Sequence, residues 1–138
     1  MPVTPNSIVT PQTPKSATVV ASVANTDYDD IPANAAAALI TAGANGARVT
    51  KIYAIPRATV TATQLQLYRS TDAGTTKRLF ESALMAAYTM AATTEAPNTD
   101  FGYSDDSPLI LGAGEVVYPA IGVALAAGVV FVAEWADY

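Results

Sequence analysis

The sequence contains no cysteine and no histidine. Without cysteine, the chain has no thiolate nucleophile, no disulfide and none of the sulfur ligands that structural zinc sites use. Without histidine, it lacks the side chain that most often moves protons near neutral pH. These two absences remove most catalytic templates. We therefore expect a protein that is not an enzyme and that uses no cofactor and no metal.

Charge is also scarce, since charged residues make up 14% of the chain against 51% for hydrophobic residues, and the net charge is -5. No run of Lys or Arg could follow a phosphate backbone or bind an anionic membrane, so neither nucleic acid nor membrane is an expected partner. The apolar stretches are interrupted before they reach the roughly 18 residues of a membrane-spanning helix, and the chain begins without a signal-peptide pattern. We expect a soluble protein made in the cytoplasm, with part of its apolar surface buried against other proteins.

The 138 residues suffice for one domain with a single hydrophobic core. Prolines at positions 2, 5, 11 and 14 gather at the start of the chain, where they fix φ and remove backbone donors. We expect residues 1–16 to form an extended arm, which is either a loose terminus or a tether that lies across a neighbouring subunit, with Ile8 and Val9 as its apolar anchor if it docks. Residues 17–138 are expected to form the folded domain.

Short segments rich in Val, Ile, Thr and Tyr follow this arm, with turn residues between them at regular intervals. Asn45-Gly46 suits a tight hairpin, and Gly112, Gly114 and Gly128 mark further turns. The pattern predicts an all-β, jelly-roll-like sandwich of two sheets with about eight strands. We expect these strands at residues 17–24, 36–41, 47–55, 63–70, 76–85, 108–111, 115–123 and 129–135.

Residues 76–92 are ambiguous, because apolar side chains recur at helical spacing between Leu79 and Tyr88. Residues 64–67 nevertheless alternate with a period of two, and the turn residues at 71–75 would let the next segment pair back as a strand. We favour a strand over residues 76–85 and expect Leu65, Leu67 and Leu79 to face one interior.

The turn at residues 70–76 resembles the S-x-D-x-G-x-T core of the Asp-box, a hairpin motif of sialidase-like propellers. Asp72 and Gly74 stand at the matching positions, whereas Lys77 replaces the tryptophan that normally closes the motif. In that family the box is a structural turn, so the resemblance implies a hairpin and not a reaction.

Polar side chains outside the Asp-box-like turn give few candidates for a functional site. The acidic cluster at residues 27–30 lacks the glycine and distal glutamate of a helix-loop-helix calcium loop, and we interpret it and the second cluster at residues 100–106 as solvated loops. The seven tyrosines could belong to the core, contact a protein or stack on sugar rings. We take Tyr28, Tyr103 and Tyr138 as candidate interface residues, beside Ile8 and Val9.

Three further stretches, at residues 46–58 (GARVTKIYAIPRA), 75–79 (TTKRL) and 133–138 (AEWADY), resemble small structural proteins of tailed bacteriophages. The resemblance is one of overall pattern over roughly residues 40–138 and carries no catalytic motif. It implies a capsid decoration or cement protein that binds the major capsid protein or another virion protein, as a homotrimer on the capsid surface. The alternative is a carbohydrate- or receptor-binding module of a head or tail fibre.

Overall fold

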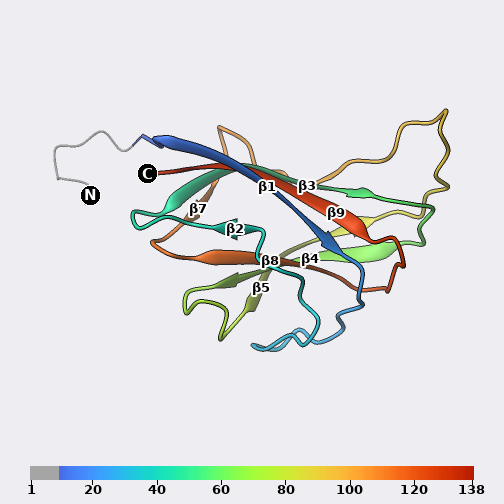
Figure 1. Cartoon of the computed structure of the whole chain (residues 1–138), viewed down its shortest axis with the longest axis horizontal. Coiled ribbons are helices and arrows are strands. Elements are labelled where there is room, and N and C mark those ends of the chain that lie inside the picture. Colours follow the sequence, from blue (N-terminus) through green and yellow to red (C-terminus); the bar gives the residue numbers. More distant parts are fainter. Residues whose placement is uncertain (1–9) are drawn as a thin grey trace.

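The computed structural model describes residues 10–138, so the expected anchor residues Ile8 and Val9 lie outside the described part of the chain. Its nine described strands form two antiparallel sheets, stacked as two layers in Figure 1, which confirms the all-β sandwich. Sheet A contains β1 (Thr13–Ala21), β3 (Ala47–Pro56), β6 (Thr99–Asp100), β7 (Leu109–Leu111) and β9 (Val129–Asp137). Sheet B contains β2 (Ile40–Thr41), β4 (Thr63–Ser70), β5 (Arg78–Met85) and β8 (Val116–Ile121).

The observed strands overlap the expected ones, with three differences at the level of whole elements. β6 was not expected, and the strand expected at residues 36–41 is reduced to Ile40–Thr41. β1 begins at Thr13 and ends at Ala21, so that residues 13–16 of the expected arm belong to sheet A. The ambiguous segment does form a strand, β5. Within residues 10–138, no helix is long and apolar enough to cross a membrane.

The strands are ordered β1-β9-β3-β6 in sheet A, where β7 also pairs with β3, and β2-β8-β4-β5 in sheet B. The first strand therefore lies beside the last, and the second beside the one before the last. β9 runs between β1 and β3, paired with β1 from Thr13↔Asp137 to Ala21↔Val129. The two ends of the described chain consequently meet at one end of the sandwich (Figure 1).

The core lies between the sheets because alternate side chains of each strand point inward. In β9, Phe131 and Ala133 are fully buried, and in β4 so are Leu65 and Leu67. These residues belong to one continuous cluster of buried apolar side chains. Phe131 stacks on Phe101 with ring centroids 6.3 Å apart, so the loop after β6 is fixed to the core.

Leu79 does not face this core, contrary to the sequence prediction. The register between β4 and β5 shifts between Leu67 and Tyr68, so that Leu67 lies opposite Glu81 whereas Tyr68 lies opposite Leu79. This bulge turns the start of β5 over, and Leu79 is 37% exposed. The single extra residue at the bulge could not be seen in a pattern of period two.

The turn between β4 and β5 has the structure that its Asp-box-like sequence indicates. The Asp72 carboxylate accepts hydrogen bonds from the Thr76 amide and the Ser70 hydroxyl, each at 2.8 Å. Gly74 takes a φ of 92°, in the left-handed region that glycine favours. The bonds from Thr76 and then Ser70 lower the pKa of Asp72 below its ordinary value of 3.8.

Replacing a leucine of the core by aspartate should prevent folding, whereas the same change at Leu79 should not. Leu67 is fully buried, and an unpaired buried charge costs several kcal/mol, about as much as the total stability of a small domain. We expect Leu67→Asp to be insoluble or unfolded by far-UV circular dichroism and Leu79→Asp to remain folded. A folded Leu67→Asp protein would contradict the assignment of the core.

The Asp72 turn should make stability depend on pH in acid. Because the folded-state pKa lies below the unfolded value, the ionised carboxylate stabilises the fold above the unfolded pKa, and this contribution disappears as the pH falls through the folded pKa. We expect urea denaturation to find Asp72→Ala less stable than the wild type at neutral pH, with a difference that shrinks below a pH of about 4. A difference that stays constant as the pH falls would show that the carboxylate charge contributes nothing.

Candidate binding surface

The outer face of sheet A carries a patch of apolar side chains that no other described segment covers. In β9 the residues alternate between buried and partly exposed, so that Val130 and Val132 point away from the core. The register places Val130 between Val20 of β1 and Ile55 of β3, and Val132 between Thr18 and Tyr53. We call this patch the valine stripe; it consists of Thr18, Val20, Tyr53, Ile55, Val130 and Val132.

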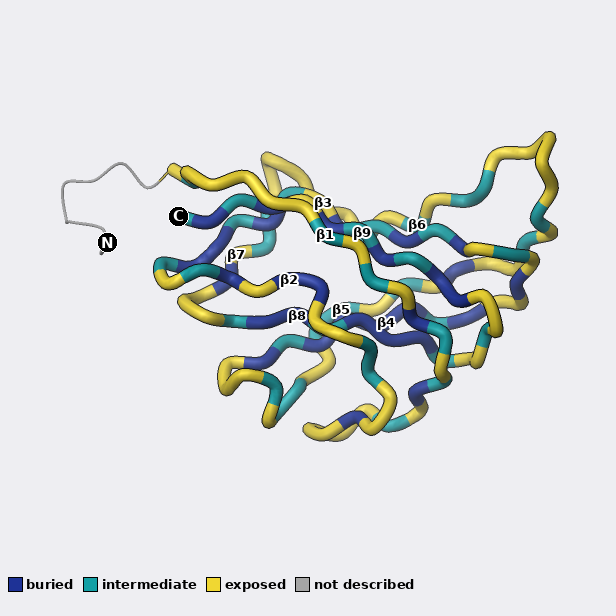
Figure 2. Tube along the Cα trace, in the orientation of Figure 1, coloured by how far each residue is buried: buried dark blue, intermediate teal, exposed yellow. Residues whose placement is uncertain are grey.

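The side chains of the valine stripe carry no charge, and the stripe spans the three long strands of the sheet. At its edge, Lys51 Nζ lies 5.1 Å from the centre of the Tyr53 ring. Val20 is 42% exposed, and Val130 and Val132 are each half-buried. In Figure 2 exposed and partly exposed segments run along β1, β3 and β9 on this side of the molecule. Contiguous apolar surface of this kind marks a site of protein contact more often than scattered exposed residues do.

Sheet B differs, because the chain itself covers part of the outer face of that sheet, over β4, and leaves Leu79 and Leu84 of β5 exposed. The segment after β1 hydrogen-bonds along the free edge of β8, from the Asn25 amide to the Ile121 carbonyl at 2.7 Å and from the Leu39 amide to the Val117 carbonyl at 2.8 Å. It also reaches the start of β5, where the Lys77 amide donates to the Asp30 carbonyl at 2.7 Å. This covering segment, residues 22–39, lies below sheet B in Figure 1.

A buried polar cluster fixes the covering segment to β4. The Asn25 side-chain amide donates to Gln66 Oε1 at 3.0 Å and to the Tyr68 hydroxyl at 2.8 Å, and all three residues are buried. Tyr68 also donates to the Asp27 carbonyl oxygen at 3.2 Å. Burial raises the pKa of the Tyr68 hydroxyl above its ordinary value of 10.0.

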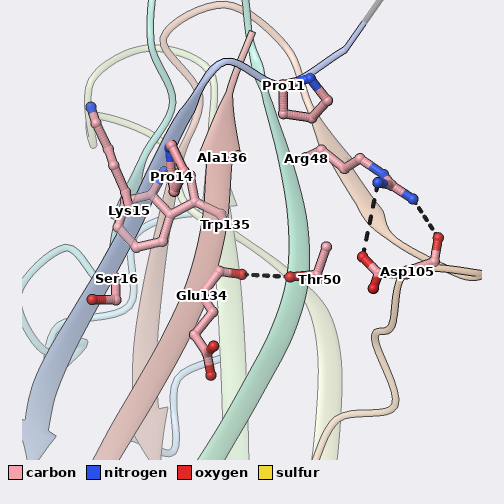
Figure 3. Close-up of a pocket in the computed structure, with 10 residues that line it drawn as sticks. All are labelled: Pro11, Pro14, Lys15, Ser16, Arg48, Thr50, Asp105, Glu134, Trp135 and Ala136. Atoms are coloured by element: carbon pink, nitrogen blue, oxygen red, sulfur yellow. Dashed lines mark hydrogen bonds and ion pairs between the residues drawn. The ribbon is translucent and has the colours of Figure 1, made fainter.

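Next to the valine stripe, the outer face of sheet A becomes polar and hollows into an open groove of about 610 Å³ (Figure 3). Arg48 closes one side, where its guanidinium lies 3.9 Å from the Asp105 carboxylate and also donates to the Asp105 carbonyl oxygen. Thr50 donates to the Glu134 carbonyl oxygen at 3.3 Å. The groove is lined by Pro11, Pro14, Lys15, Ser16, Arg48, Thr50, Asp105, Glu134, Trp135 and Ala136.

The groove offers hydrogen bonds and charges of both signs. Within residues 10–138, no group of three acidic side chains could hold a metal ion. Trp135 is only 8% exposed, so it presents little ring surface on which a ligand could stack. The valine stripe and this groove together form a surface suited to binding another molecule.

The three tyrosines that the sequence suggested as interface residues lie in three different places. Tyr28 is 51% exposed on the covering segment, where its hydroxyl donates to Gln64 at 2.9 Å. Tyr103 packs against the core, and burial beside Glu81 raises the pKa of its hydroxyl to about 12. Tyr138 ends the chain, with its amide bonded to the Gly46 carbonyl at 3.2 Å. The structure therefore does not bring these tyrosines together.

The valine stripe was missed at the level of sequence, although one signal pointed to it. Residues 129–132 read Val-Val-Phe-Val, an apolar run without alternation. A strand with apolar side chains on both faces is typical of a sheet that is covered on both sides. The sequence indicates which residues of this strand face the core. The residues that lie beside Val130 and Val132 on the outer face follow only from the pairing with β1 and β3.

Searches for related proteins find no family model and no curated protein that matches the sequence. The interpretation of this surface therefore depends on its geometry and chemistry.

The cluster beneath the covering segment should contribute measurably to stability. Asn25→Ala leaves Gln66 and Tyr68 buried without one of their hydrogen-bond partners, which should cost about 1–3 kcal/mol. The matched control is Asn34→Ala, since Asn34 is exposed and its side chain makes one bond, to the Ala24 carbonyl; we expect a change within about 0.5 kcal/mol. Urea denaturation of the two variants measures the difference, and equal stabilities would contradict a structural role for the cluster.

Proposed function

We propose that this chain is a non-enzymatic structural protein of a virion, a capsid decoration protein that binds the major capsid protein through the outer face of sheet A. The observation that carries the proposal is the uncovered valine stripe. The chain covers β4 of sheet B with its own residues and leaves Leu79 and Leu84 exposed on β5, whereas on sheet A apolar side chains of three neighbouring strands face outward side by side. A partner that buries the stripe would remove this apolar surface from water, and that burial would stabilise the complex.

The nested order of the strands supports this class of protein. β1 lies beside β9 and β2 beside β8, each pair in its own sheet, and this nested order is compatible with a jelly roll. Jelly rolls are common among viral capsid domains and lectins. Because one fold serves many functions, this support is an analogy of fold and adds to the argument from the surface without replacing it.

The site of attachment is the capsid surface, and the oligomer that we propose there is a homotrimer, because capsid lattices offer threefold positions. Many copies on one particle would make a modest interface effective, since each added contact acts at a high local concentration.

Mass spectrometry of particles purified from cells that carry the gene should find the chain at a fixed ratio to the major capsid protein. Its absence from particles would overturn the proposal.

A charge placed in the valine stripe should weaken attachment without affecting folding. Val132 points away from the core, and an unpaired charge buried at an interface lowers affinity by roughly tenfold or more. We expect Val132→Lys to keep its circular dichroism spectrum and to be lost from particles in sedimentation. Leu84→Lys is the matched control, because Leu84 is 72% exposed on β5 of sheet B and should be retained. Equal retention of both variants would place the attachment surface elsewhere.

A carbohydrate- or receptor-binding module is the second candidate, and the polar groove of Figure 3 is the feature that favours it. Arg48, Glu134 and Ser16 could exchange hydrogen bonds with sugar hydroxyls. The dispersed tyrosines argue against it, since they form no stacking platform. Binding of a glycan array that Arg48→Ala abolishes, with unchanged retention on particles, would favour this candidate over the first.

A further inference from the structure

A second, uncharged groove lies at the end of β1 that is farthest from the start of the chain. Its volume is about 300 Å³. One side is formed by the end of β1 and the residues that follow it, and the other side by an alanine-rich stretch of the covering segment. No lining residue is charged, and most are small. The groove is lined by Val20, Ala21, Ser22, Val23, Ala33, Asn34, Ala35, Ala36 and Ala37.

The backbone beside this groove is an open sheet edge. Among the described strands β1 pairs only with β9, so its other edge has unpaired amide and carbonyl groups. Pro14 and Lys15 protect the first part of β1, as proline and lysine often protect edges. From Ser16 to Ala21 the edge carries neither, and an extended segment could pair with it there.

The chain itself contains a segment with matching chemistry. Residues 1–9 have no charged side chain, and Ile8 and Val9 are the bulky apolar pair among them. Fully extended, these residues span about 30 Å. Their composition suits an uncharged groove whose small alanines leave space for larger aliphatic side chains.

Geometry favours a neighbouring copy over the same chain as the source of this segment. Gln12 continues the pairing beyond the start of β1, since its amide donates to the Asp137 carbonyl at 2.7 Å. The chain therefore enters at the Thr13 end of β1, whereas the groove lies at the Ala21 end, about 26 Å away at 3.3 Å per residue. Within one chain, Ile8 and Val9 stand four and three residues before Gln12, and at most about 14 Å of fully extended chain cannot bring them to the groove.

We propose that residues 1–9 of one copy dock along the β1 edge of a neighbouring copy, with Ile8 or Val9 in the alanine-lined groove. Each copy gives a segment and receives one through a different surface, so the contact is heterologous and closes when the copies form a ring, such as a trimer. This inference concerns contacts between copies of the chain and does not require the capsid as a partner.

The absence of native cysteine allows a direct test by disulfide formation. One copy carries Ile8→Cys, and a second copy with an affinity tag carries Ala37→Cys, an exposed position in the groove. After mixing and mild oxidation, we expect a tagged heterodimer on non-reducing gels. The matched control replaces Ala37→Cys by Leu84→Cys, which is exposed on sheet B and should give little heterodimer.

Two other results would overturn the proposal. Heterodimer no greater than with Leu84→Cys would show that residue 8 does not reach the groove of another copy. A chain with both Ile8→Cys and Ala37→Cys that forms only an internal disulfide would show that the segment folds back on its own chain.

Light scattering gives an independent measurement on the unmodified protein. We expect a mass above the 14.2 kDa of one chain, which falls to that of one chain when Ile8 and Val9 are both replaced by aspartate. Both residues lie outside the described sandwich, so the variant should keep its β-sheet circular dichroism. A wild-type mass of one chain at every concentration would contradict the proposed docking of residues 1–9 on a neighbouring copy.

Discussion

The structure depends on the placement of the last strand in the middle of sheet A. β9 forms hydrogen bonds with β1 on one side and with β3 on the other, while Phe131 and Ala133 extend from it into the core. Near its end, the buried Asp137 carboxylate contacts Lys15 Nζ at 2.6 Å and accepts the Gly43 amide at 3.2 Å, which ties β1 and the turn after β2 to the same strand. Neither β1 nor β3 can complete its hydrogen bonds within sheet A until β9 lies between them. Folding should therefore be dominated by contacts between residues far apart in the sequence, which is typical of slow-folding β proteins.

The same strand explains why the two outer faces of the sandwich differ. A central strand with apolar residues on both sides supplies the core with one set and leaves Val130 and Val132 on the outside. On sheet B the covering segment buries the outward-pointing Gln66 and Tyr68 and satisfies them with Asn25. Sheet A has no such cover among the described residues. Folding thus covers β4 on the outer face of sheet B and leaves the apolar side chains of sheet A free to associate with a partner, which is the physical basis of the binding proposal.

Local patterns were sufficient to predict the sandwich, because turn residues and alternation of period two are local properties. They could not reveal the bulge that exposes Leu79, since one inserted residue changes the pairing and leaves the composition of the strand unchanged. β6 was missed because a strand of two residues has no period. The cluster of Asn25 with Gln66 joins residues 41 positions apart, and the valine stripe joins three strands by register. For the same reason, spacing along the chain could not show that Tyr28, Tyr103 and Tyr138 lie apart.

The central claim is that the outer face of sheet A is a protein-binding surface. Cryo-electron microscopy of particles that carry the chain tests this claim most directly, because it shows which face of each sandwich meets another protein. We predict that Val130 and Val132 lie within about 4.5 Å of apolar atoms of the capsid protein. A particle in which the outer face of sheet A points to solvent, with the sandwich held by sheet B or by its loops, would contradict it.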